Sequence, residues 1–497
     1  MSKKDFLSLA PVLWGIPSNL YAGELSGLYG SHLLKEMGEI IKYYQIYEEG
    51  AEFNPEGSNG DYIPSEIQYT KAARLVNKEA RFLFSRKPDV FVELTPQGEG
   101  ESSLEQAKKA QSLYQKYVNK VFTKEKLHSK LLKAAKDCFI GKRVAWSLNF
   151  DEINKRISLD FIPSLEFIPT YSEENPDELE KLILFYNLND CENSLDQRIY
   201  KKRFSIQKGK CYLYEAIFDG VGNLVEEITP ERATKFPYIP AGVILNDGLT
   251  GDVSGQSDIG RLCKYESSYS QLANSDIDAE RKSMNPIIYG LDLNPSTTTG
   301  LSTAPGSFWD LSTDIQSIDG AKGSVGILQA NFGYSEALNK TLGRMDEAMY
   351  EELDIPNLSL ESMAGVITSG KALKALYWPL MVRCDEKMLS WKPALQEMVK
   401  TLIDATKFYP GATAPYGGTG LPEYEYSVNV ENLYPLPEDE AEEKTLDMLE
   451  VTNNVRSKKS YMMKWGLTST EADNELKQIA TEAQLLENSY GLTPPME

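Results

Sequence analysis

The amino-acid sequence predicts a mostly helical α+β protein with several domains, small antiparallel sheets and one long kinked helix. Apolar residues repeat at helical spacing over residues 110–138 and 373–402, and strand-like alternation fills the region 143–227 between them. With 497 residues, of which 41% are hydrophobic, the chain is long enough for roughly two to four domains with real cores.

The charge of the chain is strongly negative, at −21 for 52 basic and 73 acidic residues. Proteins that grip nucleic acid by its phosphates need clustered Lys and Arg. The basic clusters that we identify are short, Lys201-Lys202-Arg203 and Lys458-Lys459. The acidity favours solubility, or it keeps a passing polyanion from adhering. No apolar run reaches about 18 residues, so neither a membrane span nor a signal peptide is expected.

The residue types that most often carry catalysis and metal binding are scarce. Only two histidines are present, His32 and His128, and their separation argues against a histidine triad or a zinc site. Five cysteines form no CxxC pair and are expected to be reduced thiols. We therefore expect no enzymatic activity, no metal and no cofactor.

The first 250 residues are expected to contain three helices followed by a sheet. The first helix covers residues 20–46, and the second is capped by Ser65 and ends before Pro88. Ser102 and Glu105 form a capping box for the third, whose pattern continues toward Cys138. The expected strands form one antiparallel sheet of sequence neighbours, and they are 143–149, 156–161, 182–186, 198–204, 210–218 and 224–227.

Residues 256–355 are predicted to form two helices around a short insert. Asp258 can cap the first helix, which ends near Asn285, and the second covers residues 334–353. The insert holds two strand-like stretches, 287–291 and 307–311, with a polar turn between them.

A much longer helix follows from about Leu373. Its apolar stripe indicates about 36 helical residues, or about 54 Å at 1.5 Å per residue, with kinks expected at Pro379 and Pro393. After it, alternation over 424–430 predicts a strand with one buried face. The acidic run 438–443 suits the first turns of another helix, and a capping box of Thr468 and Glu471 opens the last one.

Three motifs resemble functional sites without completing them. Residues 365–371 match the start of a phosphate-binding loop, but Ala372 lacks the hydroxyl that Mg²⁺ needs. Asp89 and Glu93 suggest a metal-nuclease strand, yet Thr95 stands where a lysine is required. A run of carboxylates at 346–354 could bind a cation or form a solvated helix face, and Arg344 is expected to pair with Glu347 three residues later. The run is Asp346, Glu347, Glu351, Glu352 and Asp354.

Five phrases of the sequence, in this order and spacing, resemble the portal proteins of tailed bacteriophages, the ring at the capsid vertex where the genome enters. The phrases are NKEARFLFSRKP at 77–88, FIPSLEFIPTY at 161–171, GQSDI at 255–259, APG at 304–306 and SGKALK at 369–374. The resemblance covers most of the chain and implies a non-enzymatic channel for double-stranded DNA in the virion.

The resemblance also implies a division of the chain into named parts. Residues 1–255 correspond to the wing, with a second wing segment at 369–410 that holds the long kinked helix. The stem consists of two helices, at 256–283 and 332–355. The remaining parts are the clip at 284–331, the tunnel loop at 356–368, and the strand and helical crown at 411–497.

Three groups of residues are the expected contact sites. The DNA-facing residues of the tunnel loop, which contains no Lys or Arg and has Gly365 as a pivot, are Ser359, Glu361, Ser362, Met363, Gly365, Val366 and Ile367. The clip residues expected to contact terminase or an adaptor are Asn294, Thr297, Thr298, Thr299 and Ser302. The acidic channel candidates are the five carboxylates of the 346–354 run.

The partners implied by the resemblance are further copies of the chain in a twelve-membered ring, the major capsid and scaffolding proteins, the large terminase subunit and a head–tail adaptor. DNA would pass without sequence recognition, and assembly would take place in the host bacterial cytoplasm, away from any membrane. Two alternatives stay open: another structural ring or adaptor component of the virion, and a nucleotide hydrolase that uses residues 365–371.

Overall fold

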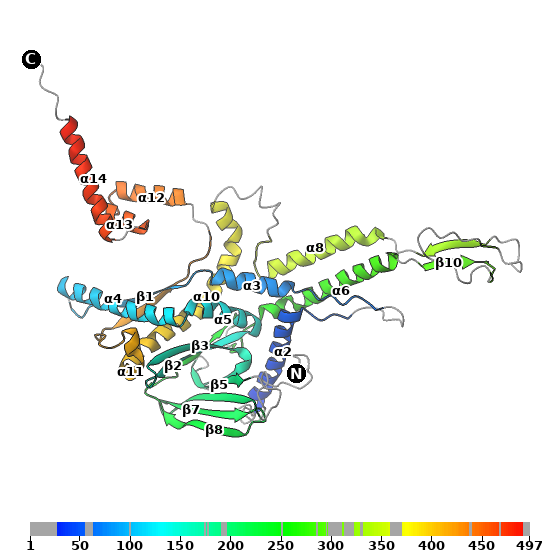
Figure 1. The fold of residues 1–497 in the computed structure, drawn as a ribbon, viewed down its shortest axis with the longest axis horizontal. Helices are drawn as coiled ribbons and strands as arrows, with labels where there is room; N and C mark the ends of the chain where they lie inside the picture. The colour runs from blue at the N-terminus through cyan, green and yellow to red at the C-terminus, as the bar shows by residue number, and fades with distance from the viewer. Residues whose placement is uncertain are drawn as a thin grey trace, which may run out of the picture. The chain divides into compact units, whose positions relative to one another are not determined.

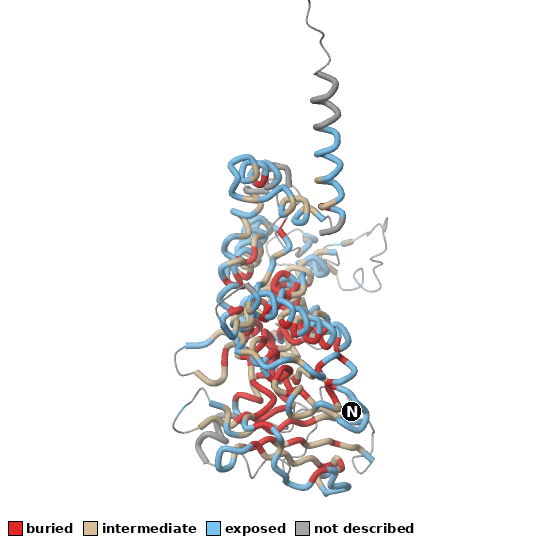
Figure 2. Tube along the Cα trace, turned by 90° about the vertical axis from the view of Figure 1, so that its left-hand side faces the viewer, coloured by how far each residue is buried: buried red, intermediate tan, exposed pale blue. Residues whose placement is uncertain are grey.

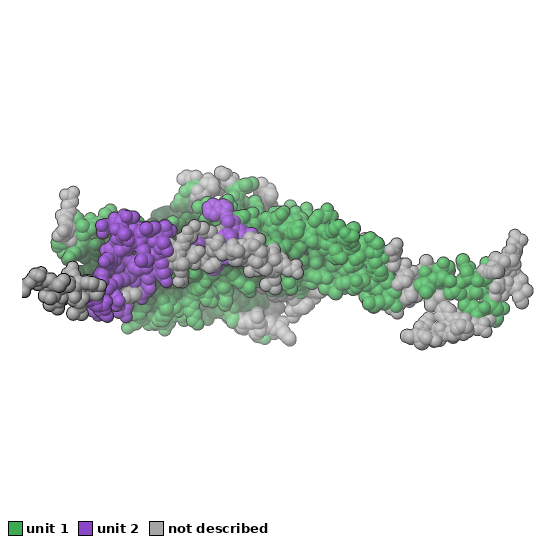
Figure 3. All heavy atoms as spheres, turned by 90° about the horizontal axis from the view of Figure 1, so that it is seen from above, with its two compact units in different colours: residues 1–357, 379–434 green, residues 358–378, 435–497 purple. Residues whose placement is uncertain are grey.

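A computed structural model describes most of the chain as an α+β, mostly helical protein (Figure 1). The chain forms two compact units, one of residues 1–357 and 379–434, and another of residues 358–378 and 435–497 (Figure 3). The residues that the structure describes are 27–54, 63–98, 101–172, 175, 178–189, 196–249, 252–284, 287–294, 296, 311–312, 323–328, 332–357, 370–436, 440–466 and 469–490.

The structure has four helices where three were predicted in the N-terminal region, and their first residues differ from the predicted ones. Their bounds are α2 Gly27–Glu49, α3 Lys71–Leu83, α4 Glu101–Lys124 and α5 Leu127–Gly141. The Ser65 cap is wrong, since α3 begins six residues later. The capping box of Ser102 is also wrong, because α4 already includes Glu101. The third helix is broken at Lys126, whose φ of 52° places it in the left-handed region.

The predicted single sheet is two antiparallel sheets. A three-stranded sheet has the order β3-β2-β9, and a five-stranded sheet has the order β4-β5-β6-β7-β8. The strands confirm the six predicted segments and add β4 and β9. Their bounds are β2 Arg143–Asp151, β3 Arg156–Pro163, β4 Phe167–Tyr171, β5 Leu179–Asn189, β6 Arg198–Gln207, β7 Lys210–Asp219, β8 Leu224–Ala233 and β9 Ala241–Leu245. The prediction that strands pair with their neighbours in sequence is wrong at β9, which pairs with the distant strand β2.

A separate two-stranded ladder joins distant parts of the chain. β1 (Asp89–Leu94) pairs antiparallel with β12 (Tyr426–Glu431), and Val92 lies opposite Val428. The strand predicted at 424–430 is therefore confirmed within two residues. The segment with Asp89 and Glu93 is its partner, and both carboxylates lie on exposed positions of β1.

The two helices around the insert are confirmed as α6 (Asp258–Met284) and α8 (Ser335–Glu352). The insert contains an antiparallel pair of β10 (Ile287–Leu291) and β11 (Ser324–Leu328). The predicted strand at 307–311 lies mostly outside the described residues, and its described end, Leu311, is not in a strand. The partner of β10 thus comes from later in the chain than predicted.

The long helix is confirmed as α10 (Gly370–Phe408) and continues through both Pro379 and Pro393. From Leu380 onward its apolar stripe is largely buried, with Trp391, Leu395 and Leu402 each at most 1% exposed. Since the two compact units divide between Trp378 and Pro379, the first proline marks a structural boundary. Buried residues gather in the body of the first unit (Figure 2).

The remaining elements complete the two units. In the first, α11 (Pro410–Thr413) follows α10. The second contains α12 (Glu440–Thr452), α13 (Lys458–Lys464) and α14 (Ser469–Tyr490). The acidic start of α12 is confirmed, although α13 was not predicted. The predicted cap at Thr468 lies outside the described residues, and so does the start of the predicted first helix at 20–26.

Candidate functional site

The helices α6 and α8 form a pair, side by side, with the β10–β11 hairpin joining them in sequence (Figure 1). Between them they carry ten acidic and six basic residues, a net charge of −4. α8 is mostly exposed, and Met349 is its buried residue. A helix pair with so little apolar cover needs other contacts to hold it in place.

One such contact is an extended segment at residues 63–70, which we call the strap. A polar stripe on α6 binds the strap backbone at helical spacing. The Asn274 side chain accepts from the Ile67 amide at 2.8 Å and donates to the Ile67 carbonyl at 2.7 Å. One turn further, the Asp278 carboxylate accepts from the Ser65 amide at 2.9 Å. One end of the stripe is Glu266, which accepts from the Ala72 amide at 3.2 Å.

Several buried residues of α6 are polar because they lie on the face that contacts the strap. Glu266, Ser270, Asn274 and Asp278 recur every four residues and are all buried. Side chains at this spacing lie on one face of a helix. The strap pairs with no strand, and this face of α6 supplies hydrogen-bond partners for its backbone. Burial raises the pKa of Glu266 to about 7, against the opposing effect of the amide hydrogen bonds.

Lysines of α3 fasten α8 to the same region. Lys71 forms an ion pair with Asp346 and lies 3.9 Å from the centre of the Tyr269 ring on α6. About two helix turns later, Lys78 donates to the Tyr350 hydroxyl at 3.0 Å. α3 therefore contacts both members of the helix pair through cations.

A buried ionic cluster lies where α3, α6 and α10 meet, and we define it as Glu79, Asp258, Arg383 and Lys387. The Arg383 guanidinium donates to Glu79 Oε1 at 2.7 Å through Nε and to Asp258 Oδ1 at 2.6 Å through Nη2. Lys387 Nζ donates to Asp258 Oδ2 at 2.7 Å and lies 3.2 Å from Glu79 Oε1. Asn246 accepts from Lys387 at 2.7 Å and donates to Asp258 at 3.1 Å.

The ionic cluster is neutral in sum, with two cations and two anions. Burial alone would raise the pKa of Asp258, but Lys387 and Arg383 outweigh it and hold that pKa below its usual value. At Glu79 burial prevails and raises the pKa despite both cations. Because a buried charge without a partner is costly, the four groups stabilise the junction only as a complete set.

The turn before α6 carries Asp258 into the ionic cluster. Gly255 has a φ of +76°, and a Cβ there would lie 2.4 Å from the Lys142 carbonyl oxygen. Only glycine tolerates both the conformation and the close approach. The predicted cap by Asp258 is wrong, since the Ser257 hydroxyl accepts from the Gly260 amide at 3.1 Å in that role. The Asp258 carboxylate is bound by α10 instead.

Nothing in the ionic cluster resembles a nucleophile with its base. The nearest thiols, Cys138 and Cys384, are buried, and burial raises the pKa of each well above its usual value. Among the described residues, no three His, Cys, Asp or Glu side chains are placed to hold a metal ion. Within the same ranges every helix is too short or too polar to cross a bilayer. The arrangement can fix helices in place, and we see no further chemistry in it.

The structure separates the five predicted acidic channel candidates. Asp346 is paired with Lys71, and Asp354 lies 4.0 Å from Arg383. Glu347 and Glu351 are exposed on α8, and Glu352 is half-buried. Arg344, predicted to pair with Glu347, donates to the Thr341 hydroxyl at 3.0 Å instead.

The other predicted sites are mostly beyond the described residues. Of the clip residues only Asn294 is described, and it accepts from the Ser296 amide at 3.1 Å in a local turn. Thr297, Thr298, Thr299 and Ser302 lie outside the described residues, as do all the tunnel-loop residues and the loop part of the phosphate-loop motif. α10 already begins at Gly370.

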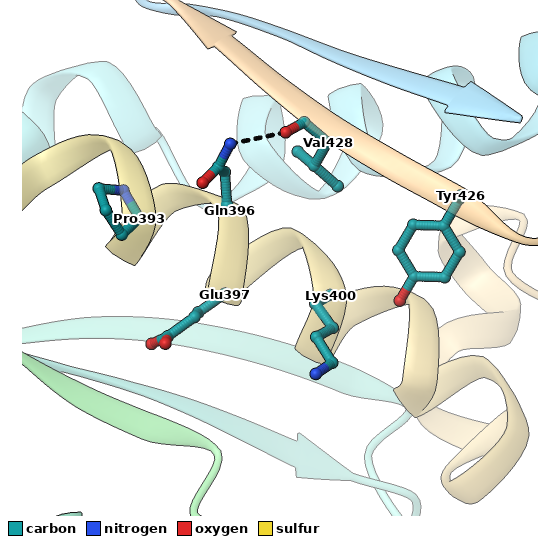
Figure 4. A pocket seen from close by; sticks show the side chains of 6 residues that line it. All are labelled: Pro393, Gln396, Glu397, Lys400, Tyr426 and Val428. Atoms are coloured by element: carbon teal, nitrogen blue, oxygen red, sulfur yellow. Dashed lines mark hydrogen bonds between the residues drawn. The ribbon is translucent and has the colours of Figure 1, made fainter. Parts of the chain in front are cut away.

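A shallow pocket of about 370 Å³ lies between α10 and β12 (Figure 4). Gln396 closes one side by donating to the Val428 carbonyl at 2.7 Å, while Tyr426 comes from β12. Lys400 and Glu397 add one charge of each sign. The pocket combines no nucleophile with a base, so it does not favour catalysis.

Residues 101–142 form a basic stretch that the short clusters of adjacent Lys and Arg do not indicate. Residues 101–142 hold ten lysines and four acidic residues, a net charge of +6 in a chain of −21. The lysines are spaced along α4 and α5 rather than adjacent, and counting charge over a 40-residue window would have found them.

Comparison with known proteins gives a family for part of the chain. Residues 299–487 match the model of the family described as phage portal protein, SPP1 Gp6-like. No curated protein matches the chain. Eighty-two chains of solved structures match. One belongs to the structure described as "Neck of native GTA particle computed with C12 symmetry", at 11% identity and a TM-score of 0.38, covering 80% of this chain and 90% of that one. The family match confirms the resemblance over residues 299–487, which contain two of the five phrases, those at 304–306 and 369–374.

Proposed function

Because residues 299–487 match the phage portal family, we propose that this chain is the subunit of a ring in a phage virion. The ring forms the channel at one capsid vertex through which double-stranded DNA is packaged and later ejected. The observation that carries the proposal is the family match, which begins within the insert and includes α8 and α10. The role is structural rather than catalytic.

The parts of the channel follow the order of the elements. In this proposal α6 and α8 form the stem, the β10–β11 hairpin lies in the clip, and α10 belongs to the wing. Residues 1–255 form the rest of the wing, residues 356–368 the tunnel loop, and residues 411–497 the strand and crown. Two features connect the proposed stem to the proposed wing: the ionic cluster joins the stem helix α6 to the wing helices α3 and α10, and the strap, which precedes α3, also binds α6.

The charge of the stem suits a channel through which DNA slides. The net −4 of the α6–α8 pair would be repeated by every subunit around the bore. Like charge repels the phosphate backbone, so duplex would pass without being gripped. Glu347 and Glu351 are the candidates best placed to act on DNA, because both are exposed and neither is a member of the ion pairs at Asp346 and Asp354.

The loop and clip assignments complete the proposal. The loop at 359–367 would touch DNA loosely, since it contains no lysine or arginine. The clip residues 294–302 would meet the large terminase subunit during packaging and a head–tail adaptor afterwards. Capsid and scaffolding proteins would surround the ring during assembly in the host cytoplasm.

Electron microscopy of the purified chain tests the proposal. We expect rings with a central hole, twelve-membered within the capsid. A monomer that stays monomeric with its capsid partners would overturn the proposal. A ring without a bore wide enough for duplex DNA, about 20 Å, would favour another structural component of the neck. Binding of ATP by the purified protein would instead favour the alternative hypothesis, a nucleotide hydrolase that uses residues 365–371.

A further inference from the structure

α4 presents a basic stripe to solvent in an otherwise acidic protein. Lys109, Lys116 and Lys120 lie on one face, at steps of seven and four residues, and all are exposed. Leu113 lies between them and is 47% exposed. Within the described part of the chain, Lys109 and Lys116 form no ion pair. We call this face the basic stripe.

A surface of opposite charge lies on β8, the edge strand of the five-stranded sheet. Glu226 and Glu227 are exposed, and neither forms an ion pair with a described residue. Leu224, Val225 and Ile228 beside them are 55%, 48% and 46% exposed. An edge strand with exposed apolar side chains has unpaired backbone groups that can bind another chain, and proteins usually block or cover such an edge.

We propose that the basic stripe of one copy docks on the β8 edge of the next copy. This inference rests on the proposed ring function and names the surfaces that form one of its subunit contacts. Lys109 to Lys120 span about 17 Å at 1.5 Å per helical residue. The β8 carboxylates available to them are the adjacent Glu226 and Glu227, since Glu231 pairs with Arg203 at 2.9 Å. The basic stripe therefore offers lysines to both carboxylates, and its remaining length lies beside the exposed apolar residues of β8.

Two different surfaces that fit each other produce a heterologous contact, which closes into a ring when the rotation between copies permits. A polar, charged rim around exposed leucine and valine side chains is the usual composition of a subunit contact. In contrast, a DNA backbone would leave Leu113 without an apolar partner. The observations thus favour a second copy over nucleic acid.

Charge reversal on each surface, alone and together, tests the proposal by mass photometry of the full chain. Lys109→Glu with Lys116→Glu, and separately Glu226→Lys with Glu227→Lys, should each raise the concentration for half-assembly by about tenfold or more at about 50 mM salt. The four changes combined should restore assembly toward wild type. Lys155→Glu with Arg156→Glu is the matched control, because it changes the same charge at the exposed β2–β3 turn.

The outcomes separate this inference from the ring itself. If wild type forms no ring, both the proposed function and this contact fail. Wild-type rings that persist in the Lys109→Glu and Lys116→Glu variant overturn the contact alone. If that variant also binds a duplex of about 30 base pairs less tightly than wild type, the stripe is a nucleic-acid surface. Folded single-surface variants that the combined changes fail to rescue overturn β8 as the partner; circular dichroism melts establish folding.

Discussion

Arg383 on α10 donates to the carboxylate of Asp258 at 2.6 Å and thereby joins the long helix to the first residue of α6. The two residues are 125 positions apart. The same guanidinium holds Glu79 of α3 at 2.7 Å. One buried side chain thus fixes the angle at which three helices meet. In the proposed ring, this junction connects the wing to the stem.

Removing that cation should destabilise the protein strongly. Arg383→Met keeps the bulk of the side chain but leaves the two carboxylates of the ionic cluster with Lys387 as their cation. An uncompensated buried charge costs about 3–5 kcal/mol, so the free energy of unfolding in urea should fall by about that amount. Lys407→Met, on the same helix, breaks the exposed pair with Glu423 and should change the free energy of unfolding little, because water screens that pair. Equal losses in the two variants would show that the cluster does not stabilise the junction.

The strap should open locally when its central anchor is removed. Asn274→Ala deletes two part-buried hydrogen bonds to the Ile67 backbone, at about 0.5–1.5 kcal/mol for each bond. Hydrogen exchange at the Ile67 amide should accelerate by about tenfold or more. Ser275→Ala is the adjacent control, since that exposed hydroxyl bonds only within α6 to the Gln271 carbonyl. Unchanged exchange at Ile67 in the Asn274 variant would contradict the anchoring role.

The sequence predicts those features whose cause is local. The stripe of α10 follows from a helical period, so the buried face could be predicted, and it is largely buried from Leu380 to Leu402. The strands β2, β3, β6 and β7 follow from alternation between clear turns. In each case neighbours in sequence decide the structure.

The features that failed have distant causes. Asp258 has the spacing of a helix cap, yet Arg383 and Lys387 take its carboxylate. Asn274 and Asp278 look like a solvated face, because the strap that covers them lies about 200 residues earlier. No pattern within α6 shows that an extended segment will need hydrogen bonds there. Of the candidate site, the sequence therefore gives the helix pair and its acidity, but neither the ionic cluster nor the strap.

Glu266 should make the folded protein less stable as the pH rises, which is the opposite of the usual effect of a carboxylate. Burial raises its pKa in the folded protein to about 7, above the value of about 4.5 expected for the unfolded chain. The folded state then binds more protons than the unfolded state between these values, so stability is lost as pH rises through that window. At 1.36 kcal/mol per pKa unit, the loss from this group is up to about 3 kcal/mol.

Glu266→Gln tests that dependence. Glutamine keeps an oxygen for the Ala72 amide and carries no charge. The free energy of unfolding of the variant should therefore exceed that of wild type at about pH 8 and equal it at about pH 5. Unfolding in urea at both pH values measures the difference. Glu280→Gln, exposed on the same helix, should follow the wild-type profile. An equal difference at both pH values would mean that Glu266 is already ionised when folded at low pH.

Reversing the exposed charge of α8 should convert a sliding surface into a gripping one. Glu347→Lys with Glu351→Lys changes each subunit by four charges, and a ring multiplies that change around its bore. We expect assembled rings to bind duplex DNA more tightly than wild type, with an affinity that falls steeply as salt rises. Packaging and ejection in infected cells should slow, because DNA that adheres to the wall cannot slide. Glu425→Lys with Glu431→Lys, exposed on and beside β12, makes the same charge change away from the helix pair. If the two variants bind DNA equally, net charge alone explains the effect, and α8 does not face the channel.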